Sequence, residues 1–165
     1  MLQLVIGNKN YSSWSMRPWV LLRQIGIPFD EVKLRFDFKD GSAYRQEVAR
    51  YSPAGLVPLL MHDSFVVWDT LDIAEYMHDA LPTAGIWPAD RQQRARARCL
   101  AAEMHSGFGA LRSHCPMNIE ANLPEVGARI WAEQEGVRRN LARLESAWAD
   151  ALAESGGPFL FGRFC

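Results

Sequence analysis

The order of strand and helix signals in the first 80 residues constrains the fold more than any other feature of this sequence. A short apolar run, Leu2 to Ile6, is ended by a glycine and an asparagine and predicts a buried strand. A helix is then predicted from about Ser15 to Ile25, with Ser15 as its cap and Pro18 in its first turn. The chain therefore opens as a strand followed directly by a helix.

The next segments complete a small mixed sheet. The first strand, helix and second strand form a crossover, which pairs the two strands in parallel. The third and fourth strands are separated by a three-residue hairpin signal and should pair antiparallel. A four-stranded mixed sheet flanked by helices follows from this order. The predicted ranges are a strand at 29–36, a polar helix at 42–51, strands at 57–61 and 65–68, and a helix at 70–80.

The composition changes at residues 81–88, which are rich in proline and glycine, and no strand signal follows them. Apolar residues recur at spacings of three and four along two stretches, which predicts two long amphipathic helices, from Asp90 to about Cys115 and from Pro124 to about Glu154. These stripes are typical of core and helix–helix contacts. We therefore expect an α/β domain at 1–80, a linker at 81–88 and an all-helical domain at 89–165. This second domain is expected to be incomplete, because two helices alone enclose a hydrophobic core poorly.

Composition excludes several classes of function. The net charge of −1 argues against nucleic acid as a partner, and the arginine run at 91–98 is typical of a solvated helix face. No stretch approaches the roughly 20 apolar residues of a membrane span. The sequence has three cysteines, an odd number, so a complete disulfide framework is not expected. The N-terminus also lacks the pattern of a secretory signal, so we expect a cytoplasmic protein. The four histidines lack metal-ligand spacing, so no metal is expected.

The loop before the first helix carries the most reactive-looking residues, Ser12 and Ser13. No cysteine precedes Cys99, so any sulfur chemistry here needs a thiol that arrives with a ligand. A helix N-terminus favours an anion, and a serine hydroxyl can donate a hydrogen bond to a thiolate and lower its pKa from about 8.5. The alternative is simple helix capping, which is strongest for Ser15.

Two further pairs stand at element boundaries. A cis bond at Val57-Pro58 would turn the Val57 backbone toward a ligand, although an unassisted X–Pro bond is cis in only about 5% of cases. Asp69-Thr70 opens the helix at 70–80, either as an ordinary N-cap or as a clamp for an amino group and a carboxylate.

Together these residues resemble the cytosolic glutathione transferases, over essentially the whole chain. The serine-type classes of that family, particularly zeta and tau, share the serine-rich loop that leads into an arginine-bearing helix. The matching segments are Ser12-Ser13-Trp14-Ser15-Met16-Arg17, Lys39-Asp40-Gly41, Pro53-Ala54-Gly55-Leu56-Val57-Pro58 and Asp69-Thr70. The resemblance implies a thioredoxin-like domain followed by an all-α domain, with glutathione as co-substrate.

The same resemblance implies a role for each matching residue. Ser12 would stabilise the thiolate with Ser13 as auxiliary, and the register between these neighbours stays open by one residue. Pro58 would be cis, and the Val57 backbone would pair with the cysteinyl part of glutathione. Asp69 and Thr70 would hold the γ-glutamyl end of the tripeptide. Lys39 would bind the glycyl carboxylate at the other end.

The electrophile is expected beside Trp14 and the first helix of the second domain. His105, Phe108 and Arg112 lie there at spacings of three and four and should share a face, although packing is the simpler role for Phe108. The implied function is conjugation of glutathione to a small hydrophobic electrophile, in detoxification, by a cytoplasmic homodimer. The alternatives are a glutathione-dependent cis–trans isomerase, like maleylacetoacetate isomerase, and a non-catalytic interaction module.

Two departures from the family pattern affect these expectations. Leu56 stands where many members carry lysine or glutamine, which removes one side-chain contact to glutathione. The sequence stops where the family's next capping segment would begin, so a shortened helical domain is expected to lack part of the electrophile pocket.

Overall fold

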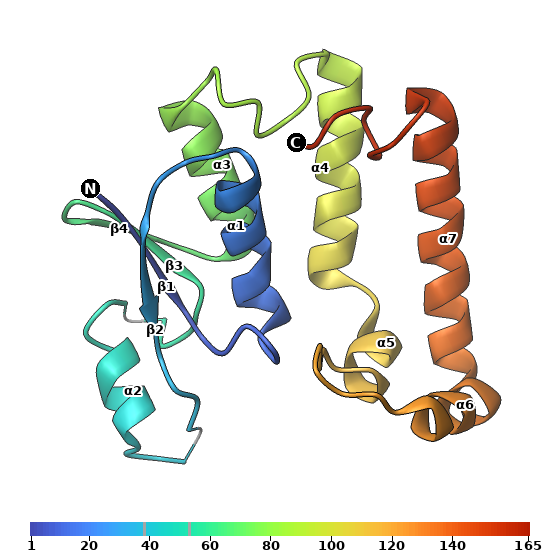
Figure 1. The fold of residues 1–165 in the computed structure, drawn as a ribbon, viewed down its shortest axis with the longest axis horizontal. Helices are drawn as coiled ribbons and strands as arrows, with labels where there is room; N and C mark the ends of the chain where they lie inside the picture. The colour runs from blue at the N-terminus through green and yellow to red at the C-terminus, as the bar shows by residue number, and fades with distance from the viewer. Residues whose placement is uncertain (38, 53) are drawn as a thin grey trace. The chain divides into compact units, whose positions relative to one another are not determined.

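The computed structural model describes residues 1–37, 39–52 and 54–165 (Figure 1). These residues form two compact units, Met1–Ile86 and Trp87–Cys165. The boundary between the units falls inside the proline- and glycine-rich stretch at 81–88.

The first unit is built on a four-stranded sheet of described residues. Its strands are β1 (Leu2–Ile6), β2 (Asp30–Lys33), β3 (Leu59–His62) and β4 (Phe65–Trp68), in the order β2-β1-β3-β4. Strand β1 pairs in parallel with β2 and antiparallel with β3, and β3 pairs antiparallel with β4. The mixed sheet expected from the order of elements is confirmed.

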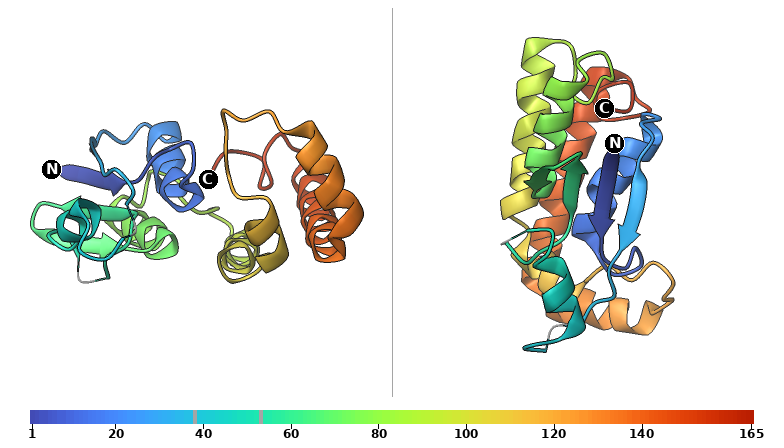
Figure 2. Two further views of the ribbon diagram at one scale, coloured as in Figure 1. Left: turned by 90° about the horizontal axis from the view of Figure 1, so that it is seen from below. Right: turned by 90° about the vertical axis from the view of Figure 1, so that its left-hand side faces the viewer.

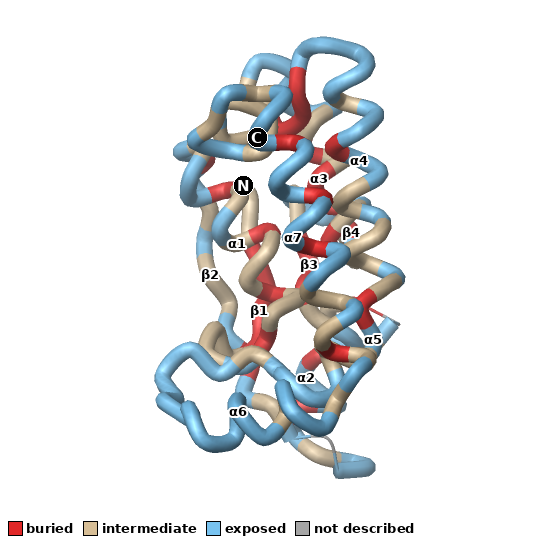
Figure 3. The backbone as a smooth tube through the Cα atoms, turned by 90° about the vertical axis from the view of Figure 1, so that its right-hand side faces the viewer, coloured by how far each residue is buried: buried red, intermediate tan, exposed pale blue. Residues whose placement is uncertain are grey.

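Helices cover both faces of this sheet. Helices α1 (Ser13–Gln24) and α3 (Thr70–Ala80) pack against one another, and α2 (Ala43–Val48) lies apart from them (Figure 1). Val5 of β1 belongs to the core cluster that contains Tyr44 and Val48 of α2. Because strand residues alternate between faces, Leu4 and Ile6 point to the side of α1 and α3. Val5, Leu4 and Ile6 are all fully buried, and Figure 3 shows a buried stretch along β1.

Several boundaries in this unit differ from the sequence-based expectation, including that of α2, which is shorter than the predicted 42–51. The N-cap of α1 is Ser12 and not Ser15, so Pro18 lies inside the helix and beyond its first turn. The sequence offers three serines at this start, and local spacing alone does not choose among them. Strand β3 begins at Leu59 because Pro58 has no N–H to give to the ladder, and β2 is shorter than predicted.

The second unit contains four described helices where two were expected. They are α4 (Arg91–Ser106), α5 (Gly109–His114), α6 (Pro124–Glu133) and α7 (Glu135–Ser155). The first expected helix breaks at Gly107, which is extended, and Phe108, which is left-handed with φ 60°. The second breaks at Gln134, whose ψ of 86° is not helical. The apolar stripes continue across both breaks, which is why they suggested unbroken helices.

Helices α4 and α7 run side by side in opposite directions, as Figures 1 and 2 show. Helices α5 and α6 pack against α7, and the segment after α7 folds back toward α4. Among the described residues, no helix has the length and apolar character required to cross a membrane.

Candidate functional site

Strand register gathers four separate segments at one end of the sheet. Val5 lies opposite Leu59, and Leu59 lies opposite Trp68. The parallel pairing sets Ile6 beside Lys33. The ends of β1, β2 and β4 and the start of β3 therefore lie together. The segments that leave from this end are the serine loop, the 34–42 loop with Lys39, Val57-Pro58 and Asp69-Thr70. The segments that carry the sequence-predicted residues of the first unit therefore begin or end at the same edge of the sheet.

The serine loop presents one nearly buried hydroxyl and one accessible one. Ser12 is 8% exposed, and its Oγ accepts a hydrogen bond from the Ser15 backbone N–H at 3.3 Å. The Ser12 and Ser15 hydroxyls lie 2.8 Å apart, and Ser15 Oγ accepts from the Gly7 N–H at 3.0 Å. Ser13 is the first residue of α1 and is half-buried. The N-terminus of α1 can therefore offer both hydroxyls and the positive end of the helix dipole to an anion.

The Val57–Pro58 peptide bond is cis, as the family resemblance implied. Pro58 is buried and Val57 is half-buried, while the neighbouring Leu56 side chain is 66% exposed. Pro53, the first residue of the matching motif, lies outside the described residues.

Asp69 and Thr70 form an unusual helix start. Asp69 has φ 72° and ψ 148°, a region that residues with a side chain seldom adopt, and its carboxylate accepts from the Leu71 N–H at 2.9 Å. Thr70 is 6% exposed, and its buried Oγ1 has no hydrogen-bond partner among the described residues. Backbone strain and an unsatisfied buried hydroxyl together are what a ligand site often shows.

Lys39 lies on an exposed loop that starts at the same end of the sheet. Its backbone N–H donates to the Asp37 carboxylate at 3.2 Å, and the Ser42 hydroxyl donates to the Asp37 carbonyl oxygen at 2.6 Å. These bonds hold the loop closed and leave the Lys39 side chain at the surface.

One set of hydrogen bonds that holds the serine loop in place was not predicted from the sequence. Lys9, in the serine loop, donates to both carboxylate oxygens of Glu31 at 2.9 and 3.1 Å, and Trp19 Nε1 donates to the same group at 2.7 Å. Burial tends to raise the pKa of Glu31, but these hydrogen bonds and the charges of Lys9 and Arg23 outweigh it and lower the pKa. The three partners are distant in sequence, so no local signal announces them.

The four residues expected at an electrophile pocket are divided between the two units. Trp14 belongs to the first unit, where the Arg17 guanidinium lies 4.2 Å from the centre of its ring. The expected common face of His105, Phe108 and Arg112 is wrong, because the chain leaves the helix between α4 and α5. The Arg112 guanidinium donates to the carbonyl oxygens of Met104 and Gly107, which ties the two helices together across this break.

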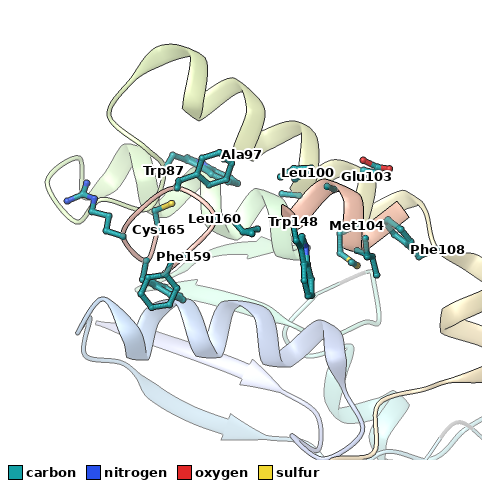
Figure 4. Close-up of a pocket in the computed structure, with 16 residues that line it drawn as sticks. Trp87, Ala97, Leu100, Glu103, Met104, Phe108, Trp148, Phe159, Leu160 and Cys165 are labelled. Atoms are coloured by element: carbon teal, nitrogen blue, oxygen red, sulfur yellow. The ribbon is translucent and has the colours of Figure 1, made fainter. Parts of the chain in front are cut away.

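Phe108 instead lines a cavity of about 390 Å³ inside the second unit (Figure 4). His105 and Arg112 are not among the described residues that line it. The cavity is bounded by α4, α7 and the segment after α7, and its lining is mostly aromatic and aliphatic. Glu103 at its edge forms a bidentate ion pair with Arg143, at 2.6 and 2.7 Å. Across residues 1–37, 39–52 and 54–165, no cluster of three or more potential metal-ligating side chains is present.

Comparisons with known proteins point to one family. The model of the glutathione S-transferase N-terminal domain matches residues 11–80. Glutathione S-transferase 1 of Dianthus caryophyllus is 27% identical over 145 residues, which cover 87% of this chain and 63% of that protein. Maleylacetoacetate isomerase of Rattus norvegicus is 28% identical over 123 residues, 74% of this chain and 56% of the relative. The chain thus spans less than two thirds of the length of either relative.

Solved structures agree on the fold. A glutathione transferase homologue from Burkholderia, crystallised with bound glutathione, aligns with a TM-score of 0.70 and 27% identity over 99% of this chain and 74% of that one. The omega 3C glutathione transferase of Trametes versicolor aligns with a TM-score of 0.63 at 20% identity, over 96% of this chain and 64% of its own. The first unit therefore has the thioredoxin-like fold. The alignments also include the helical second unit, since they cover nearly the whole chain.

Proposed function

We propose that this chain, whose residues 11–80 match the glutathione S-transferase N-terminal domain, transfers glutathione to a small apolar electrophile. The observation that carries the proposal is the convergence of the serine loop, the cis Val57–Pro58 bond and the Asp69-Thr70 helix start at one end of the sheet. Each of the three segments offers a different kind of group to a ligand.

The residues of the first unit suit the parts of glutathione. We assign the γ-glutamyl end to Asp69 and to the buried Thr70 hydroxyl, which gains a hydrogen-bond partner when the tripeptide binds. We assign the cysteinyl backbone to Val57 and the glycyl carboxylate to Lys39. Glutathione itself supplies the reacting sulfur, and the chain's own groups bind, orient and ionise it.

Ser12 is our candidate for the group that stabilises the thiolate, with Ser13 as auxiliary. A hydroxyl donates to the anionic sulfur and lowers the pKa of the bound thiol, and the N-terminus of α1 adds to the effect. The thiolate then attacks an electrophilic carbon, a C–S bond forms, and a leaving group such as halide departs with its bonding electrons. Positioning of the two reactants supplies the rest of the rate increase. Trp14 is our candidate contact for an apolar electrophile.

The proposal is tested by affinity and turnover measured together. Wild type, Ser12→Ala and Ser13→Ala are bound to immobilised glutathione and assayed for thiol addition to a chromogenic aryl halide. We expect all three to bind and Ser12→Ala to lose turnover by about 10-fold or more. Binding with no turnover in any of the three would instead favour a non-catalytic module, a role that the exposed Leu56 supports.

A second candidate is a glutathione-dependent cis–trans isomerase, supported by the similarity to the Rattus norvegicus and Mus musculus isomerases, each 28% identical over 123 residues. Here the thiolate adds to a conjugated cis diacid, the bond rotates, and the thiolate leaves again. Isomerisation of such an acid that needs catalytic glutathione and Ser12, faster than conjugation of the aryl halide, would favour this reading.

Similarity to the glutathione S-transferases also leads us to propose a homodimer that removes reactive electrophiles in the cytoplasm. The exposed aromatic side chains on β4, an edge strand of the sheet, support the dimer.

A further inference from the structure

Ser15 lies directly behind Ser12, and its side chain is fully buried. Its Oγ accepts a hydrogen bond from the Gly7 N–H at the end of β1 and lies 2.8 Å from Ser12 Oγ. Capping of α1 uses only the Ser15 backbone N–H, which donates to Ser12 Oγ. The Ser15 hydroxyl is therefore an additional polar group that the cap itself does not require.

The hydrogen bond between the Ser12 and Ser15 hydroxyls can run in either direction. Each hydroxyl has one hydrogen and two lone pairs. If Ser12 donates to Ser15, the Ser12 hydrogen is used inside the pair. If Ser15 donates to Ser12, then Ser12 Oγ accepts from both the N–H and the hydroxyl of Ser15, and its own hydrogen is left for a third partner. An anion in front of Ser12 selects the second arrangement, because only that one provides it with a donor.

We propose that Ser15 is a positioning residue that orients the Ser12 hydroxyl toward the sulfur of glutathione. This inference rests on the proposed function, in which Ser12 donates to the thiolate. The chain of hydrogen bonds runs from the Gly7 N–H to Ser15 Oγ, from the Ser15 hydroxyl to Ser12 Oγ, and from the Ser12 hydroxyl to sulfur. Donors in such a chain polarise one another, so Ser12 becomes a stronger donor than an isolated serine.

Burial makes the effect larger than it would be at the surface. Ser15 is fully buried and Ser12 is 8% exposed, so water competes poorly for the bond between them. The Gly7 N–H is fixed by its place at the end of β1, which gives Ser15 a constant partner on its far side. The end of β1 therefore fixes the orientation of the Ser15 hydroxyl, and Ser15 in turn orients the Ser12 hydroxyl that faces the ligand.

The test measures the pKa of the thiol of bound glutathione, from the ultraviolet absorbance of the thiolate as a function of pH. We expect Ser15→Ala to raise this pKa by about half a unit, which lowers the thiolate fraction below the pKa roughly threefold. Ser12→Ala should raise it further. Ser15→Thr retains the hydroxyl and should keep the wild-type value. Ser106→Ala removes a serine hydroxyl that only donates to the Ala102 carbonyl oxygen within α4 of the second unit, so it is the matched control and should leave the pKa unchanged.

The outcomes separate this inference from the proposed function. If Ser12→Ala raises the pKa and a folded Ser15→Ala does not, the positioning role is wrong and the donor role of Ser12 stands. If neither variant changes the pKa, the donor role fails as well. Should Ser15→Ala not fold, Ser15→Cys replaces the hydroxyl with a weaker donor of similar shape, and an unchanged pKa in that variant would equally overturn the inference.

Discussion

At the residue scale, Glu31 shows how one side chain holds a functional loop in place. Its carboxylate accepts from Lys9 of the serine loop and from Trp19 of α1, and the Lys9 ammonium lies 4.6 Å from the centre of the Trp19 ring. The Glu31 side chain is 23% exposed, so this pair is better shielded than a surface ion pair. The group fixes the loop before α1 relative to β2.

The lowered pKa of Glu31 gives a stability prediction with a definite sign. Burial alone would raise the pKa, but the bonds from Lys9 and Trp19 prevail, so the folded value lies below the ordinary 4.5. The stabilisation is present above pH 4.5 and is lost as the pH falls through the folded value. We expect Glu31→Gln to lower the free energy of unfolding by about 1 kcal/mol at pH 7 and by much less at pH 3.

Urea denaturation of wild type and Glu31→Gln at both pH values measures this difference. Glu47→Gln, at an exposed position on α2, serves as the control and should behave as wild type. An equal loss at pH 7 and pH 3 would show that the charge of Glu31 is not what matters.

Asp69 combines a helix cap with a strained backbone. Asp69→Ala removes the cap and keeps the positive φ, whereas Asp69→Gly removes the cap and relieves the backbone. We therefore expect the glycine variant to be more stable than the alanine variant by about 1 kcal/mol or more, measured by chemical denaturation. Both should bind glutathione more weakly than wild type, measured by calorimetry. Equal stabilities would mean that the φ of 72° carries no strain.

At the element scale, the break between α4 and α5 depends on the glycine at its centre. A Cβ on Gly107 would lie 2.7 Å from the Glu103 carbonyl oxygen, which belongs to the backbone of α4. A Cβ on Gly109, two residues later, would meet nothing within 4 Å. The two glycines therefore form a natural comparison.

We expect Gly107→Ala to lower the free energy of unfolding by about 1–3 kcal/mol, because helix backbone must shift to admit the methyl group. Gly109→Ala should be neutral or stabilising by up to about 1 kcal/mol, since it only reduces the freedom of the unfolded chain. Thermal and urea denaturation of the pair measure both effects. If Gly107→Ala is as stable as wild type, the backbone at the break between α4 and α5 can shift to admit a methyl group at little cost in free energy.

The elements also show where sequence reasoning succeeds and where it fails. The range of β4 and that of α3 match the expectation, because clear breakers and caps bound both. The breaks at Phe108 and Gln134 were missed, since the apolar stripe runs on through each of them. The sequence favours Ser15 over Ser12 as the cap of α1, and this preference is wrong because any of the three serines is a suitable cap residue. The cis bond at Pro58 came from resemblance, since it is seldom expected of a single X–Pro pair.

At the scale of the whole molecule, the exposed edge strand β4 gives a test of the proposed dimer. Phe65 and Trp68 are 59% and 51% exposed, and Phe65 packs on Tyr76 with ring centres 5.6 Å apart. If a second copy covers this edge, a charge placed there should weaken the dimer. We expect Trp68→Glu to sediment as a monomer at concentrations where wild type is a dimer.

Trp131→Glu, at a residue 54% exposed on α6, is the matched control and should not change the mass. A dimer that persists in Trp68→Glu would place the interface away from β4. A monomeric wild type would remove the homodimer from the proposal altogether.

The meeting of four loops at one end of the sheet has a consequence for how this protein gains its affinity. Residues between 12 and 70 must all be in register before a tripeptide finds its full set of contacts. Bound glutathione then adds contacts that connect all of these segments through a single ligand. The affinity for glutathione should therefore depend on the whole sheet. A substitution that disturbs a distant edge strand should weaken binding although the substituted residue does not contact the ligand.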